Sequence, residues 1–275
     1  MDYKIVASDL DGTLLDSHGN ISVENFEAIK QIADKGVYFV PASGRTLKEM
    51  PKDLIENQNI RYIIYSNGAV VYDKITGEKI TLCIPDDIKN KLFDLFFSCD
   101  CHVIVRFGGM GYVDKNMQTE EHFRYYQINP EHKGVILDYA KYCDDFETVC
   151  RNCEDVEVIS VFFKDLKDRD ECISVINKSG TLGYANISQN NLEIFSLAAG
   201  KGNALKALCE KLGCDIDKAI ATGDSDNDAM MLKMAGVGLA PSNAPQRIKD
   251  VADCVICSND EHVAKYIYES YIGRE

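Results

Sequence analysis

Apolar residues in the first third of the chain follow two alternating spacings. Short apolar runs at residues 3–8, 37–41 and 61–65 are typical of buried strands. The windows between them, 22–35 and 46–57, repeat apolar residues at the spacing of a helix face. The last third continues this alternation, with predicted helices at 201–212, 226–234 and about 260–270 and predicted strands at 218–222 and 236–240. Alternation of strands and helices predicts a parallel sheet with right-handed crossovers.

The middle of the chain, residues 84–188, has a different order of elements. Its patterns predict helices at 86–98 and 168–177 and strands at 101–106, 111–114, 156–163 and 181–186, and a further strand follows at 192–196. We interpret this region as a separate module. The fold expected is therefore α/β, a Rossmann-like parallel-sheet core with helices on both faces, made of residues 1–83 and 189–275, with an α+β domain inserted at 84–188.

Composition narrows the class of protein. The 275 residues are 45% hydrophobic and 27% charged, which is ordinary for a globular protein and excludes a collagen or an acidic disordered tail. The net charge is −14 and no Lys/Arg run forms a basic face, so we expect no nucleic-acid partner. No apolar stretch is long enough to span a membrane. The start has no pattern of an export signal, and eleven cysteines, an odd number, suggest reduced thiols, so we expect a cytoplasmic protein.

Two carboxylates follow the first predicted strand. Asp9 and Asp11 lie two residues apart, and residues i and i+2 of an extended chain point the same way. They are therefore aimed together at the carboxyl edge of a parallel sheet, where open α/β folds bind ligands. Their repulsion favours a bound cation. A plain surface turn is the alternative, because Asp and Gly12 are common turn residues.

A second acidic group, Gly223-Asp224-Ser225-Asp226-Asn227-Asp228, follows another apolar strand. Helix capping explains one of its carboxylates but not all three. Two acidic clusters at two strand ends favour a hard divalent cation, and Mg²⁺ suits them because it binds few carboxylates together with water and phosphate.

Two further segments suit an anion. Ser43-Gly44-Arg45 follows the second strand and offers a hydroxyl and amides to phosphate oxygens. Lys201 is placed at the start of a helix, where a cation opposes the helix dipole unless an anion binds there. A solvated surface lysine is the alternative.

Together these segments resemble the four ordered motifs of the haloacid dehalogenase-like phosphatases. They are Asp9-Leu10-Asp11-Gly12-Thr13, Ser43-Gly44-Arg45, Lys201 and Gly223-Asp224-(x)2-Asn227-Asp228. The long insertion between the second and third motifs, with Asn67-Gly68-Ala69 and Ser242-Asn243-Ala244, resembles the Cof-like branch, whose inserted domain is a cap. The sequence departs at Ser43, where threonine is commoner, and at Pro241-Ser242, where Met-Gly is commoner.

The resemblance implies a role for each residue. Asp9 is the expected nucleophile, which forms an aspartyl-phosphate, and Asp11 the expected general acid and base. Mg²⁺ is expected on Asp9, the backbone carbonyl of Asp11 and Asp224, with Asp228 in support. The remaining assignments are phosphoryl binding by Leu10, Ser43, Gly44, Lys201 and Asn227, and substrate contact by Arg45 and Asn67. The resemblance implies hydrolysis of a small phosphorylated metabolite, a sugar phosphate or similar phosphomonoester.

Three alternative functions are open to a chain with these motifs. A phosphosugar mutase or phosphotransferase would return the phosphoryl group to a sugar. A signalling receiver also forms an aspartyl-phosphate, but receivers are about half this length and need no carboxylate two residues after the nucleophile. A catalytically idle phosphoprotein binder is the third, and it would not need the complete set of reactive groups that the sequence contains.

Overall fold

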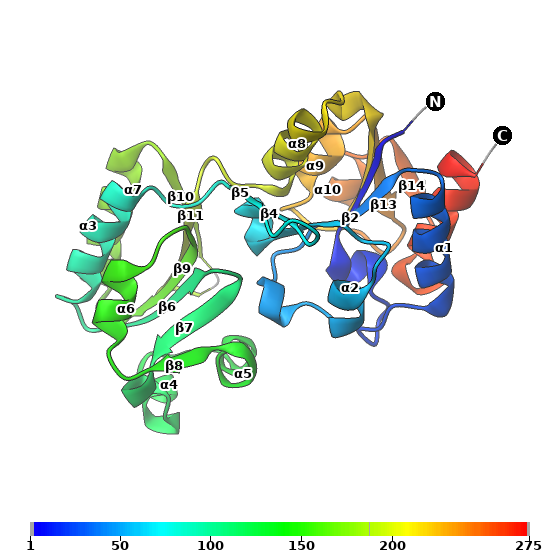
Figure 1. The fold of residues 1–275 in the computed structure, drawn as a ribbon. Helices are drawn as coiled ribbons and strands as arrows, with labels where there is room; N and C mark the ends of the chain where they lie inside the picture. The colour runs from blue at the N-terminus through cyan, green and yellow to red at the C-terminus, as the bar shows by residue number, and fades with distance from the viewer. Residues whose placement is uncertain (1–2, 187, 274–275) are drawn as a thin grey trace. The chain divides into compact units, whose positions relative to one another are not determined.

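The computed structural model describes residues 3–186 and 188–273 and separates the chain into two compact units. The first unit contains residues 1–44, 50–80 and 200–275, and the second contains residues 45–49 and 81–199. Each unit has its own sheet and its own helices (Figure 1).

The first unit is built on a parallel sheet with the strand order β14-β13-β12-β1-β2. Its strands are β1 (Ile5–Ser8), β2 (Tyr38–Pro41), β12 (Ala219–Thr222), β13 (Val237–Pro241) and β14 (Cys254–Ile256). Every residue of β1 and β12 is buried, as expected for strands covered on both faces. Ile5 pairs with Ala219 and Ser8 with Thr222, so β1 and β12 end side by side.

Two groups of helices accompany this sheet, in agreement with the expected α/β core (Figure 1). Helix α1 (Val23–Asp34) packs against α11 (Val263–Ile267), and α8 (Lys201–Leu212) packs against α9 (Ala229–Met234). The short helices α2 (Lys52–Glu56) and α10 (Gln246–Lys249) complete the set described in this unit. Ser22 caps α1 by accepting from the Asn25 amide, which explains why the helix begins there.

A small antiparallel sheet extends the first unit beyond β2. It contains β3 (Tyr62–Tyr65), β4 (Val70–Asp73) and β5 (Lys79–Thr81) in that order. An isolated parallel bridge between Ala42 and Ile64 joins β3 to the segment after β2. The carboxyl end of β3 therefore lies next to Ser43, whose amide donates to the Ile64 carbonyl at 3.0 Å.

The second unit is built on a six-stranded sheet with the order β10-β11-β9-β6-β7-β8. Its pairs are antiparallel except for β7 with β8. The strands are β6 (Cys101–Phe107), β7 (Met110–Asp114), β8 (Lys141–Cys143), β9 (Val156–Phe163), β10 (Leu182–Ala185) and β11 (Asn191–Ser196).

Alternating side chains of β6 enter two different cores in this unit. Cys101, Val103 and Val105 pack with α3 (Asp86–Phe96), α6 (Phe146–Asn152) and α7 (Leu166–Ser179). Ile104 packs instead with residues of α4 (Glu120–Tyr125) and α5 (Pro130–Tyr139). Because neighbouring strand residues face opposite sides, the sheet carries helices on both faces.

Several elements differ from the sequence prediction. The helix predicted at 46–57 is broken, since Pro51 lacks an amide hydrogen and disfavours a helical residue before it. The short helices α4, α5 and α6 were not predicted. The return crossing was predicted near 187–191, where Ile187 lies outside the described residues, whereas β11 pairs with β9 and the second unit runs to Ala199.

Candidate active site

The candidate active site lies in the first unit, at the carboxyl ends of β1 and β12. Asp9 directly follows β1, and its amide donates to the Thr222 carbonyl of β12 at 2.9 Å. The loop from Gly223 to Asp228 begins at the same point and leads into α9. The parallel register therefore places both predicted acidic motifs at one sheet edge.

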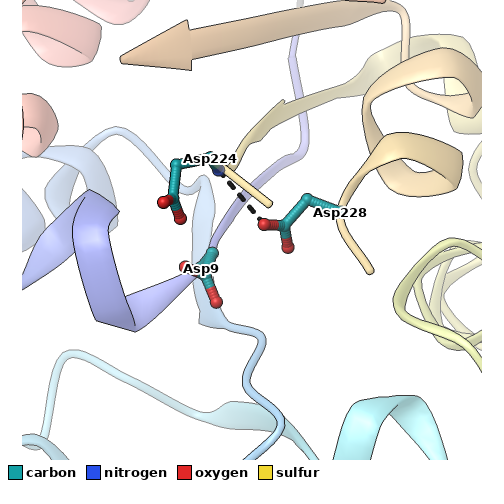
Figure 2. A group of neighbouring side chains, drawn as sticks. All are labelled: Asp9, Asp224 and Asp228. Carbon is teal, nitrogen blue, oxygen red and sulfur yellow. Dashed lines mark hydrogen bonds between the residues drawn. The ribbon is translucent and has the colours of Figure 1, made fainter. Parts of the chain in front are cut away.

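Three carboxylates converge at this edge (Figure 2). Asp9, Asp224 and Asp228 each offer an oxygen, and these oxygens lie within 4.8 Å of one another. Asp9 and Asp228 are buried, and Asp224 is half-buried. An all-oxygen set of this kind fits a hard divalent cation. The side chain of Asp11 is exposed and is not among the three.

Lys201 places a positive charge against two of these carboxylates. Its ammonium donates to Asp9 Oδ1 at 2.5 Å and to Asp228 Oδ1 at 2.6 Å, and the residue is only 1% exposed. The alternative of a solvated surface lysine is therefore wrong. The two carboxylates accompany the buried cation at the start of α8 and offset the opposing helix dipole.

Burial and like charges shift the pKa values of these groups. Burial raises the pKa of Asp9 to about 7, with Asp228 adding repulsion and Lys201 opposing both. Burial, followed by the charge of Asp228, also raises the pKa of Asp224. For Lys201, burial disfavours the cation, but Asp9 and Asp228 outweigh it and raise the pKa. The site is thus short of positive charge, which further favours a cation.

The loop that contains Gly12 approaches the loop that contains Asp224 too closely for a larger residue at position 12. A Cβ there would lie 2.5 Å from Asp224 Oδ2, and the backbone φ is +77°. Thr13 Oγ1 donates to Asp224 Oδ1 at 3.3 Å. Glycine at 12 therefore lets the turn after Asp9 pass beside Asp224.

Asp228 also organises the loop that contains Asp224. Its Oδ2 accepts from the amides of Asp224 at 3.1 Å and Ser225 at 2.9 Å, and from Ser225 Oγ at 3.0 Å. The first of these bonds is drawn in Figure 2. One carboxylate therefore fixes the loop backbone with one oxygen and pairs with Lys201 through the other.

The structure brings most of the other predicted residues to this edge. Leu10 and Ser43 are buried, and a Cβ on Gly44 would lie 2.9 Å from Asn67 Oδ1. Asn227 Nδ2 donates to Asn67 Oδ1 at 2.8 Å. Arg45 is different, because it belongs to the second unit, where its guanidinium donates to the Glu49 carbonyl at 3.0 Å.

Three residues of the site were given no catalytic or binding role from the sequence: Thr13, Ser225 and Asn243. Asn243 Nδ2 donates to the Gly12 carbonyl at 2.8 Å, and its Oδ1 accepts from the Asn259 amide at 3.0 Å. All three lie inside segments that the motifs had already marked. The missing information was which loops lie side by side.

Comparison with known proteins gives the family. The family described as haloacid dehalogenase-like hydrolase matches residues 6–267. This chain belongs to it. The proteins similar to this haloacid dehalogenase-like hydrolase include two from Bacillus subtilis (strain 168). The 5-amino-6-(5-phospho-D-ribitylamino)uracil phosphatase YcsE is 30% identical, covering 97% of this chain and 95% of its own, and phosphatase YwpJ is 30% identical, covering 94% and 96%.

A solved structure of a haloacid dehalogenase-like hydrolase from B. subtilis has a TM-score of 0.71 and 27% identity, and covers 98% of this chain and 100% of its own. The resemblance seen in the sequence and the expected fold class are therefore confirmed, and the protein is a hydrolase. In the part of the chain that the structure describes, no helix has the length and apolar character needed to cross a bilayer.

Proposed function

We propose that this haloacid dehalogenase-like hydrolase is a Mg²⁺-dependent phosphatase that hydrolyses small phosphomonoesters through an aspartyl-phosphate on Asp9. The observation that carries the proposal is the convergence of Asp9, Asp224, Asp228 and Lys201 at one sheet edge. A carboxylate held between a lysine and two further carboxylates is poised as a nucleophile when a cation balances the charge.

Asp9 and Asp11 divide the chemistry in this proposal. Asp9 attacks phosphorus, and the leaving alcohol takes a proton from Asp11. Asp11 then removes a proton from the water that hydrolyses the aspartyl-phosphate, and inorganic phosphate leaves. The exposed position of Asp11, two residues beyond buried Asp9, suits proton exchange with the leaving group and with water.

The phosphoryl oxygens need donors around Asp9. We assign this role to Lys201, Ser43, Asn227 and the amides of Leu10 and Gly44. Lys201 already reaches Asp9 Oδ1, so its charge lies next to the proposed nucleophilic carboxylate. Phosphoryl transfer depends mainly on positioning and on neutralising spread negative charge, which is what this set of donors supplies.

The metal is assigned to Asp9 and Asp224 with the backbone carbonyl of Asp11, and Asp228 supports them. When bound, Mg²⁺ supplies positive charge that lets a phosphate dianion approach this acidic edge. Mg²⁺ fits better than a softer ion because every side-chain ligand atom of the cluster is a carboxylate oxygen.

We assign substrate choice to the second unit, as the cap predicted at 84–188. One face of its sheet carries a polar group in which Arg106 Nη1 donates to Glu193 Oε1 at 2.8 Å and to Ser160 Oγ at 3.3 Å. A partly buried polar group on a sheet, with Arg106 and Glu193 still partly exposed, is a better candidate for selecting among sugar phosphates and related metabolites than an apolar face is. We expect the protein to act in the cytoplasm.

The deciding experiment is hydrolysis of p-nitrophenyl phosphate in Mg²⁺ by wild type, Asp9→Asn and Asp34→Asn. Asp34 is an exposed carboxylate at the end of α1, which makes it a matched control. We expect Asp9→Asn to abolish turnover and Asp34→Asn to keep the wild-type rate. Full activity of Asp9→Asn, or no phosphatase activity of the wild type across a panel of phosphorylated metabolites, refutes the proposal.

A further inference from the structure

The turn that follows β3 has an unusual backbone. Ser66, Asn67 and Gly68 have φ values of 49°, 54° and 85°, three consecutive left-handed residues. Glycine adopts this region freely, but the conformation costs about 1–2 kcal/mol for each other L-residue. Such a turn persists only where its surroundings hold it, and strained residues of this kind gather at functional sites.

Two backbone contacts hold the turn against other loops of the site. The amide of Asn67 donates to the Ser43 carbonyl at 3.0 Å. A Cβ on Gly68 would lie 2.4 Å from the carbonyl atoms of Gly200 and 2.8 Å from the amide of Lys201. The turn therefore packs directly against the phosphate-binding serine loop and the residue that begins α8.

The side chain of Asn67 reaches a third loop. Its Oδ1 accepts from Asn227 Nδ2 at 2.8 Å, and on the other side of that amide Ser225 Oγ donates to Asn227 Oδ1 at 2.6 Å. Asn227 is otherwise an exposed side chain, which would rotate freely in water. These two bonds fix its amide plane and decide which of its ends carries the donor.

We infer that Asn67 is a positioning residue, which orients the Asn227 amide so that its second N–H faces the phosphoryl oxygens. This inference rests on the proposed function and changes the role expected for Asn67 from the sequence, since Asn67 acts through Asn227 rather than on the substrate. The left-handed backbone makes this possible, because it places the side-chain Oδ1 of Asn67 next to Asn227 while Gly68 passes close to Gly200.

A double-mutant cycle tests the inference with wild type, Asn67→Gly, Asn227→Ala and the double variant. Glycine keeps the left-handed turn and removes only the amide. Gln127→Gly is the matched control, because Gln127 is also left-handed, with φ 53°, and is exposed in the second unit. The measurements are kcat/KM for p-nitrophenyl phosphate and for a phosphorylated sugar, the inhibition constant of inorganic phosphate, and Tm.

We expect Asn67→Gly to lower kcat/KM by about threefold to tenfold and Asn227→Ala by about tenfold to a hundredfold. In the Asn227→Ala background, Asn67→Gly should change kcat/KM by less than about twofold, because the group it orients is gone. The inhibition constant of phosphate should rise in the same pattern, and kcat/KM should fall equally for both substrates. Tm should not change in any variant, and the Gln127→Gly control should behave as wild type.

Independent effects of the two substitutions would overturn the inference, because Asn67 would then act without Asn227. An Asn67→Gly effect confined to one substrate would assign Asn67 to direct substrate contact. The inference would also be overturned if Asn67→Gly or Asn227→Ala left kcat/KM at the wild-type value. A loss of kcat/KM that only accompanies a lowered Tm would overturn it as well. None of these results overturns the proposed phosphatase activity, which fails instead when the wild type does not hydrolyse phosphomonoesters. An Asn227→Ala variant without effect would also remove Asn227 from the proposed phosphoryl donors.

Discussion

A histidine buried in the second unit makes the stability of that unit depend on pH. His102 lies on β6 and is 1% exposed. Its ring lies among those of Phe123, Tyr126 and Phe162, with centroids 5.8–6.4 Å away. Among the described residues, neither of its ring nitrogens has a hydrogen-bond partner. Burial, with a smaller effect of His122, lowers the pKa of His102 from its ordinary 6.5 to about 4.

The direction and size of the effect follow from these two values. Between pH 6.5 and 4 the unfolded chain binds a proton at His102 and the folded chain does not, so stability falls as the pH falls through this window. Above pH 6.5 this contribution to stability is fully present. With about 1.4 kcal/mol per pKa unit, His102 alone removes about 2 kcal/mol between pH 7.5 and pH 5.

The assay is urea unfolding at pH 7.5 and pH 5 for wild type, His102→Phe and His18→Gln. Far-UV circular dichroism and tyrosine fluorescence follow it, because the chain has 14 tyrosines and no tryptophan. We expect His102→Phe to lose less stability than wild type at pH 5, by about 2 kcal/mol, in the transition of the second unit. Its ring suits the aromatic surroundings and carries no unpaired nitrogen.

His18→Gln removes an exposed histidine and should behave as wild type. Equal pH dependence of His102→Phe and wild type, or an NMR titration of His102 near pH 6.5, would refute the reasoning.

Four further predictions concern the site and the second unit. Activity on p-nitrophenyl phosphate should require Mg²⁺, stop in EDTA and recover poorly with Ca²⁺; undiminished turnover of metal-stripped protein contradicts the metal assignment. Asp11→Asn should slow turnover by about 10²–10⁴-fold and accumulate one phosphoryl group per chain, seen by intact mass after acid quench; a wild-type rate removes Asp11 as acid and base. Lys201→Met leaves buried carboxylates without their cation and should lower the free energy of unfolding by about 3–5 kcal/mol in urea; a loss below about 1 kcal/mol contradicts the pairing. Glu193→Gln, beside Arg106, should change KM for one sugar phosphate more than for another and leave p-nitrophenyl phosphate turnover nearly unchanged; equal effects on all substrates contradict the role given to the second unit.

The sequence alone determined the elements whose signal is local. The buried strands β1 and β12 and helix α8 appear where their apolar patterns predicted them, because full burial of a strand and one apolar helix face each leave a periodic record. Asp9 and Asp224 were placed at strand ends by the same logic. Their meeting followed from a general property of parallel sheets, whose carboxyl ends share one edge.

Elements with a weak apolar pattern were not predicted correctly from the sequence. Helix α4 has six residues and α6 seven, too short for an apolar period to show. The proline that breaks the predicted helix at 46–57 is visible in the sequence, but its effect was outweighed there by the apolar spacing around it.

Only the tertiary structure decided which groups touch. The sequence predicts only that Lys201 is a cation at the start of a helix. Its burial depends on Asp9, which is 192 positions away along the chain, and on Asp228, which is 27 positions away. The bond between Asn67 and Asn227 joins residues 160 positions apart. A sequence pattern records the environment of each residue along its own strand or helix, whereas the partner of a charge or an amide is set by how separate loops pack.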